Sequence, residues 1–171
     1  MLKIIGVACI VLGAGTIGFR CAGTLRRQAQ QLAELQTALC FMKNEILCRL
    51  TPLPELLHRA GEETNGAVAR LFFRLSERMK AEPHAAPQTL FSQTAKELPS
   101  LQLPAPAQRA MLGLFMAFGQ FDAQGQCRSI DLADARLREQ AELLEKARSA
   151  QSRSYRTVAV CAGLAIAVIL L

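Results

Sequence analysis

Residues 25–46 read LRRQAQQLAELQTALCFMKNEI, and the spacing of apolar side chains in this stretch decides the fold. The large apolar residues follow one another with gaps of 7, 3, 4, 3 and 4 positions, at Leu25, Leu32, Leu35, Leu39, Met42 and Ile46. Gaps of three and four place all of these side chains on one face of an α-helix. Thr51 and Pro52 favour a helix end near residue 50, because Thr caps a following helix and Pro suits its first turn. We therefore predict a long helix over residues 20–50 with one buried seam.

A second long helix is predicted over residues 126–156. Ile130, Leu137 and Leu144 lie seven residues apart there, with alanines beside them. This outer helix has the same length as the first, and at about 1.5 Å per residue each would extend about 46 Å.

The chain between the two long helices predicts four short helices and no strand. Their apolar faces are Leu53, Leu56, Leu57 and Ala60, then Val68, Leu71, Phe72, Leu75 and Met79, then Leu90, Phe91 and Leu98, and finally Ala107, Met111, Leu114, Phe115 and Phe118. The expected breaks between them are Gly61, Asn65-Gly66, a linker over residues 83–87, Pro99, and a loop bracketed by Pro104 and Pro106. Most aromatic residues lie in this middle part, so we expect the compact core there.

Both ends of the chain are apolar and uncharged, over residues 4–19 and 157–171. These stretches of 16 and 15 residues are slightly shorter than the roughly 17–25 residues that usually span a bilayer. Flanking arginines and local bilayer thinning can make up the difference. We predict transmembrane segments over residues 1–19 and 157–171, separated by a helical domain over residues 20–156. The alternative for the first segment is a cleaved signal peptide, which would leave a secreted helical protein.

Basic residues predict the orientation of these segments. They gather at the inner ends of both, at Arg20, Arg26, Arg27, Lys146, Arg148, Arg153 and Arg156. Since basic residues favour the cytoplasmic side, residues 20–156 should face the cytoplasm and both termini should lie outside.

Small residues recur every four positions in both predicted membrane segments. They are Ala14, Gly18 and Ala22 in the first, and Ala159, Gly163 and Ala167 in the second. Such a stripe lets helix backbones approach closely in lipid and predicts packing of the membrane helices. The alternative is that Ala and Gly are simply common in membrane helices.

Together these features predict an all-α protein. We expect a helical bundle of about six helices, in which two long antiparallel outer helices run into the N- and C-terminal transmembrane segments. One outer helix leaves the membrane and the other returns to it.

The sequence shows no catalytic, cofactor or metal constellation. His58 and His84 are each more typical of surface histidines, and neither a phosphate-binding glycine loop nor a Cys-x-x-Cys motif is present. Cys21, Cys40 and Cys48 should be reduced thiols in the cytoplasm, as should Cys127. The net charge is +6, but the 15 Arg alternate with Glu and only one Tyr is present, a pattern that does not indicate nucleic-acid binding. We predict neither an enzyme nor a cofactor.

Two strings of residues resemble the stage III sporulation protein AB family of endospore-forming bacteria. The first is Glu45-Ile46 followed by Thr51-Pro52-Leu53, and the second is Phe118-Gly119 with Asp122, Gln126 and Ile130. The resemblance covers both ends of the chain and weakens over residues 80–108. Gln120-Phe121 departs from the Leu-Gly that often follows Phe-Gly in that family.

The resemblance implies a non-enzymatic component of the channel between mother cell and forespore, placed in the mother-cell membrane around the forespore. The soluble part of this family is similar to the six-helix cytoplasmic domain of type II secretion F proteins, which contact a secretion ATPase. The implied partners are the other stage III sporulation A proteins, including the ATPase-like AA protein and the ring-forming membrane proteins, together with membrane lipid. The resemblance leaves open whether the protein also forms a homo-oligomer.

Two turns are the candidate partner contacts. Their residues are Thr51, Pro52 and Leu53 in one, and Phe118, Gly119 and Asp122 in the other. The alternative is that these turns only terminate helices. At the level of function, the alternative is a free-standing membrane-anchored coiled-coil interaction protein without a secretion-like platform.

Overall fold

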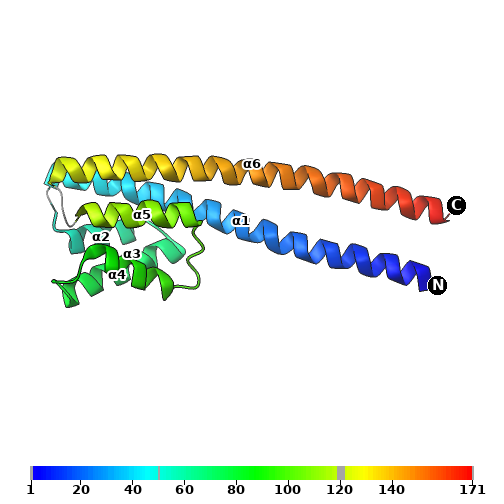
Figure 1. Ribbon diagram of the computed structural model, residues 1–171, viewed down its shortest axis with the longest axis horizontal. Helices are drawn as coiled ribbons and strands as arrows, with labels where there is room; N and C mark the ends of the chain where they lie inside the picture. The colour runs from blue at the N-terminus through cyan, green and yellow to red at the C-terminus, as the bar shows by residue number, and fades with distance from the viewer. Residues whose placement is uncertain (1, 50, 119–121, 171) are drawn as a thin grey trace. The chain divides into compact units, whose positions relative to one another are not determined.

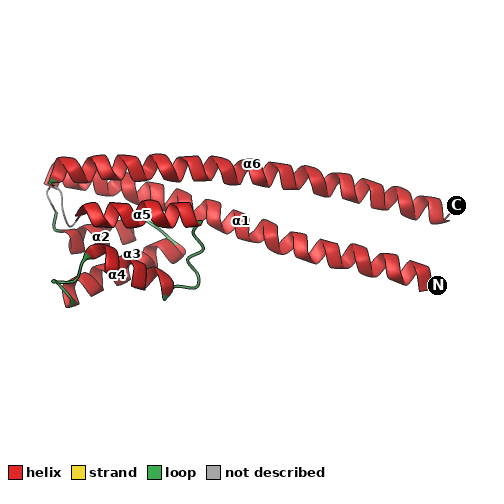
Figure 2. Ribbon diagram, viewed as in Figure 1, coloured by secondary structure: helices red, strands yellow, loops and turns green. Residues whose placement is uncertain are grey.

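The computed structural model describes the backbone of residues 2–49, 51–118 and 122–170, and side chains within residues 23–149 of those ranges. These ranges contain six α-helices and no strand (Figures 1 and 2). The helices are α1 (Leu2–Arg49), α2 (Leu53–Glu62), α3 (Gly66–Ala81), α4 (Pro87–Lys96), α5 (Ala105–Phe118) and α6 (Ala123–Leu170). The predicted all-α fold with about six helices is confirmed.

The chain divides into two compact units. One comprises residues 28–142 and contains α2 to α5 with parts of α1 and α6. The other comprises residues 1–27 and 143–171, which contain the remaining parts of α1 and α6. Within residues 28–142, α1 and α6 run antiparallel, and an ion pair between Lys43 and Asp131 joins them.

The predicted seam of α1 is buried in the first of these units. Leu32, Leu35, Leu39 and Met42 have no exposed surface, and Ile46 is 3% exposed. The other helices contribute Leu57, Phe72, Leu75, Leu90, Met111, Phe115, Ile130 and Leu137 to the same buried set. The rings of Phe91 and Phe115 stack at 4.8 Å between α4 and α5. Burial of this much apolar surface is the main term that stabilises the bundle.

Several predicted boundaries were wrong. α4 begins at Pro87, inside the predicted linker, and ends at Lys96, before the predicted Leu98 and Pro99. Pro52 rather than Thr51 is the N-cap residue of α2. Gly61 does not end α2, because the helix continues to Glu62 and Gly61 lies buried against the ring of Phe73. Pro106 lies within α5 rather than in a loop, since a proline in the first turn has no hydrogen bond to lose. α6 begins at Ala123 rather than near residue 126.

Where the structure describes side chains, no helix is long and apolar enough to cross a membrane. The predicted transmembrane segments over residues 1–19 and 157–171 lie outside that part of the chain. The same holds for the small-residue positions Ala14, Gly18, Ala22, Ala159, Gly163 and Ala167.

Gly66 and Gly113 offer a matched pair of Gly→Ala substitutions with opposite expected effects. Gly66 has a φ of +64° at the start of α3, so Gly66→Ala should lower the free energy of unfolding by about 1–2 kcal/mol. Gly113 lies inside α5 with open space around it, so Gly113→Ala should raise it by about 0.5–1 kcal/mol. Thermal unfolding followed by circular dichroism measures both. A melting temperature that Gly66→Ala leaves unchanged would contradict the predicted strain.

Candidate functional site

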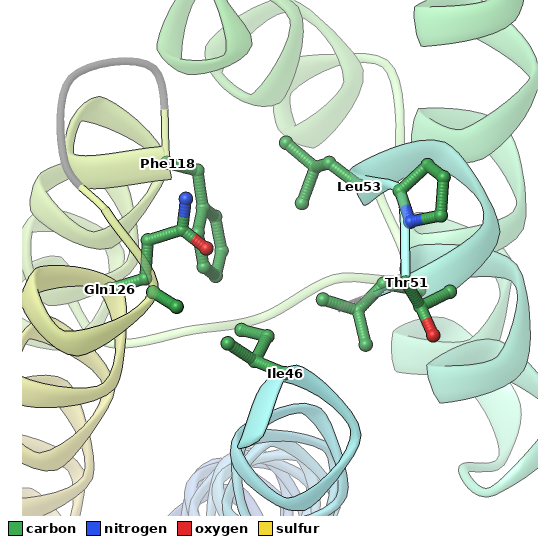
Figure 3. A pocket seen from close by; sticks show the side chains of 8 residues that line it. Ile46, Thr51, Leu53, Phe118 and Gln126 are labelled. Atoms are coloured by element: carbon green, nitrogen blue, oxygen red, sulfur yellow. The ribbon is translucent and has the colours of Figure 1, made fainter. Parts of the chain in front are cut away.

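The two predicted contact turns meet at one hollow. Thr51, Pro52, Leu53 and Phe118 line a cavity of about 280 Å³ within residues 28–142 (Figure 3). The other lining residues are Ile46, Leu56, Ala123 and Gln126. Gly119 lies outside the residues that the structure describes, and Asp122 is not in the lining. The structure thus brings together four of the six predicted contact residues.

The lining of this hollow is mainly apolar. Ile46, Leu53 and Phe118 come from three different helices and face a shared space. Ile46 and Leu56 are buried, whereas Pro52 is exposed at the edge. A recess of this kind can accept apolar side chains of a partner, because burial of apolar surface drives association.

A buried carboxylate holds the turn between α1 and α2. Glu45 is only 9% exposed, and its Oε1 lies 2.7 Å from Nη1 of Arg59. The hydroxyl of Thr51 donates to the same oxygen at 3.1 Å. Arg59 also binds Glu55 at 2.8 Å, and the guanidinium of Arg49 lies 3.8 Å from Glu45. Since one buried acid joins the end of α1 to Thr51 and to α2, it fixes the position of the first turn that lines the hollow.

The site predicted from sequence does not include Glu45 or Arg59. A usable signal existed, because Glu45 lies between Met42 and Ile46 of the buried seam, and an acid in that position needs a partner. The identity of the partner depends on how α2 packs against α1, which spacing along the chain does not reveal.

Asp122 caps α6. Its Oδ1 accepts from the backbone N–H of Gly125 at 2.9 Å, and its carbonyl accepts from the N–H of Gln126 at 2.9 Å. Its negative charge also lies at the positive end of the helix dipole. The geometry of Asp122 therefore matches the alternative reading, in which this residue terminates a helix.

Two further groups have shifted pKa values at the contact between α1 and α6. A 2.6 Å hydrogen bond to Asp131 raises the pKa of Lys43. Burial raises the pKa of the Cys127 thiol, so this side chain stays protonated near neutral pH. Cys40, Cys48 and Cys127 are all free thiols.

Neither histidine is among the residues that line the hollow. His58 lies 3.8 Å from Glu62 and edge-on to Phe73, and His84 is exposed in the linker after α3. Across the residues with described side chains, no group of three His, Cys, Asp or Glu is arranged to hold a metal ion.

Glu45→Ala should destabilise the bundle by about 1–3 kcal/mol, because Arg59 and Thr51 lose a buried charged acceptor. Thermal unfolding of the full chain in detergent measures the effect. Glu77→Ala is the control, since Glu77 is exposed on α3 and has no ion pair among the described residues. Equal melting temperatures for the two variants would contradict this role of Glu45.

Asp122→Ala should lower the free energy of unfolding by about 1 kcal/mol, whereas Asp122→Asn should stay close to the wild type. Asn retains the capping oxygen but removes the charge. The same melting experiment distinguishes the two, and destabilisation by both variants to an equal degree would show that the charge, rather than the cap, is what matters.

Comparison with known proteins gives a consistent match. The family model for stage III sporulation protein AB matches residues 3–171. "Stage III sporulation protein AB" of Bacillus subtilis (strain 168) is 24% identical over 172 residues, which is 100% of each chain. A solved structure of a stage III sporulation protein AB has a TM-score of 0.65 and 22% identity, and the match covers 72% of this chain and 98% of that one. This structural likeness concerns the fold. Because the family model matches nearly the whole sequence, the chain belongs to the stage III sporulation protein AB family.

Proposed function

We propose that this chain is a membrane-anchored, non-enzymatic adaptor of the stage III sporulation channel between mother cell and forespore. The observation that carries the proposal is the convergence of two turns, distant in sequence, on one apolar hollow. In this proposal, residues 1–19 and 157–171 anchor the chain, residues 20–156 face the cytoplasm, and the hollow receives a partner.

The anchoring part rests on the uncharged stretches over residues 4–19 and 157–171 and on the basic residues at their inner ends. The secondary structure supports it, because α1 runs from Leu2 to Arg49 and α6 from Ala123 to Leu170 without a break. No loop separates either apolar stretch from the helix that enters the bundle. Continuous helices transmit force or position better than flexible linkers do.

The adaptor part of the proposal rests on the roles of the ionisable side chains near the hollow, which pair with one another or cap a helix. Glu45 and Arg59 pair with each other, and Asp122 caps a helix. These roles are structural, and they leave a mainly apolar recess that is lined in part by the exposed Pro52. Such a recess is suited to recognition rather than to reaction chemistry.

The proposed occupant of the hollow is the secretion-like AA ATPase of the stage III complex. The resemblance of the family to type II secretion F domains supports this choice, and the ring-forming membrane proteins are the other proposed partners. In this arrangement the protein links movement or position of the ATPase to the membrane assembly.

A photo-crosslinking amino acid at Pro52 tests the proposal in sporulating cells. We expect it to capture the ATPase or another stage III A protein, identified by mass spectrometry, because Pro52 is exposed at the rim of the hollow. The control position is Gln93, which is exposed on α4 and away from the lining. Leu53→Glu should abolish capture at Pro52 by placing a charge in the apolar recess.

Two results would contradict the proposal. Equal capture from Pro52 and Gln93 would show that the hollow does not select a partner. Capture of no stage III protein from Pro52, at normal protein levels, would favour the free-standing coiled-coil anchor.

A further inference from the structure

One face of α1 is exposed and yet carries no charge. Its residues follow one another with gaps of 3, 4, 3, 4 and 3 positions, at Gln30, Ala33, Thr37, Cys40, Asn44 and Leu47. All six are exposed, and Leu47, the largest of them, is 59% exposed. We call this set the α1 stripe. It has the spacing of a heptad seam but consists of residues other than those of the buried seam.

This composition is unusual for a solvent-facing helix surface, which is normally charged. The exposed face of α3, for comparison, carries Arg70, Arg74, Glu77 and Lys80. On α1, by contrast, no charged residue between positions 28 and 48 is exposed. Between positions 28 and 48, the exposed surface of α1 therefore carries no charge, in contrast to the exposed face of α3.

The charged residues that flank the stripe already have partners within the chain. Glu34 accepts from the backbone N–H of Asn65 at 3.0 Å. Lys43 binds Asp131 at 2.6 Å, across to α6. Glu45 binds Arg59 on α2 at 2.7 Å.

Half of the stripe residues are polar, namely Gln30, Thr37 and Asn44. The Thr37 hydroxyl donates to the carbonyl of Ala33 at 3.1 Å and so is satisfied within the helix. The side-chain amide of Asn44 makes no hydrogen bond among the residues whose side chains the structure describes. Its amide is available to a partner.

We propose that a second copy of this chain packs along the α1 stripe, α1 beside α1 in parallel, as a two-stranded coiled coil. The parallel direction rests on the proposed function, because two copies anchored in one membrane with the same orientation present α1 in the same direction. In such a two-fold arrangement each stripe residue lies near the same residue of the partner copy.

The absence of charge on the α1 stripe favours a second copy of this chain over a partner helix with charged residues in its seam. When the stripes of two copies face each other, no charged residue lies opposite a residue of like charge. In heptad terms Gln30, Thr37 and Asn44 take a positions, and Ala33, Cys40 and Leu47 take d positions. The flanking pairs between copies are then Ala29 with Glu34, Gln36 with Phe41, and Lys43 with Cys48, none of them like-charged. A partner helix with charges in its seam would instead bury them unpaired.

Asn44 supplies the register. All three a positions are polar, with Gln30 and Thr37 beside Asn44. A buried Asn at an a position pairs with its counterpart and favours a two-stranded parallel arrangement, at a cost in stability. Ala33 allows close approach of the backbones nearby.

The size of the stripe predicts a weak dimer. Residues 30–47 extend about 26 Å, and a helix is about 10 Å wide, so the two copies would bury roughly 500 Å². Stable interfaces in solution bury about 1,200–2,000 Å². Confinement of both copies to one membrane raises their effective concentration, and there the contact should form.

Single-cysteine variants of the full-length protein in membranes test the dimer. One variant retains Cys40 alone, with Cys9, Cys21, Cys48, Cys127 and Cys161 replaced by Ala. Its matched control retains Cys48 alone, because Cys48 is also exposed on α1 but lies outside the stripe. After mild oxidation with copper phenanthroline, we expect several-fold more disulfide-linked dimer from Cys40 than from Cys48 on a non-reducing gel.

A second test introduces a charged residue into the α1 stripe. Thr37→Glu in the Cys40 variant should abolish the crosslink, because it places like charges opposite each other one turn away. Gln93→Glu on α4 should leave the crosslink unchanged. Melting temperatures show whether each variant is folded.

Equal dimer from Cys40 and Cys48, or a Cys40 crosslink that survives Thr37→Glu, would overturn the proposal. So would attachment of Cys40 to a different protein. Alkaline extraction of the same membranes shows whether only the proposed dimer is wrong or whether the proposed membrane anchoring is wrong as well. A chain that stays in the pellet without dimerising overturns the dimer alone, whereas a chain that is released overturns the anchoring and the dimer together.

Discussion

The burial of one seam of α1 determines the rotation of that helix, and most other features of the bundle depend on this rotation. Leu32, Leu35, Leu39 and Met42 are fully enclosed. Because successive residues of an α-helix are about 100° apart, the direction of every other side chain on α1 is then set. Lys43 reaches α6, Glu45 reaches α2, and the stripe that includes Cys40 and Asn44 faces outward. A helix rotated by one residue would bury a lysine or leave a carboxylate without its arginine, and either outcome costs several kcal/mol.

This rotation also gives the two proposed contact surfaces different properties. The hollow is enclosed by helix ends from several elements, and its shape depends on the Glu45 ion pair and the Asp122 cap. The α1 stripe belongs to one helix and depends only on which side of α1 is left uncovered. The two surfaces share no residue, so a partner in the hollow and a second copy along α1 can be bound at once in the proposed assembly. Substitutions that affect one surface should leave the other intact.

Much of the fold could be read from the sequence, because short helices leave a local signature. The apolar spacing in residues 25–46 predicted the buried seam, and Thr51-Pro52 and Asn65-Gly66 lie where α2 and α3 begin. Errors arose where a residue had two possible roles. Gly61 predicts a helix end, but it lies inside α2, where the ring of Phe73 leaves no room for a Cβ atom. Pro106 was placed in a loop, but it belongs to the first turn of α5.

The candidate site was only partly predictable. The two turns could be named from sequence, since Thr, Pro and Asp are typical of helix starts. That Thr51, Pro52 and Leu53 lie beside Phe118 could not be derived, because these residues are more than sixty positions apart and no local rule relates them. That Asp122 does not line the hollow, although its neighbour Ala123 does, also depends on packing.

By itself the sequence determined the helices, the face of α1 that must avoid water, and the uncharged stretches at the two ends, because each is a matter of residue type and spacing along the chain. Only the tertiary structure decided which ion pairs form, where the two turns meet, and which face of α1 remains exposed. The physical reason is that burial and ion pairing depend on what lies across from a side chain, and the neighbours that decide this come from distant parts of the chain.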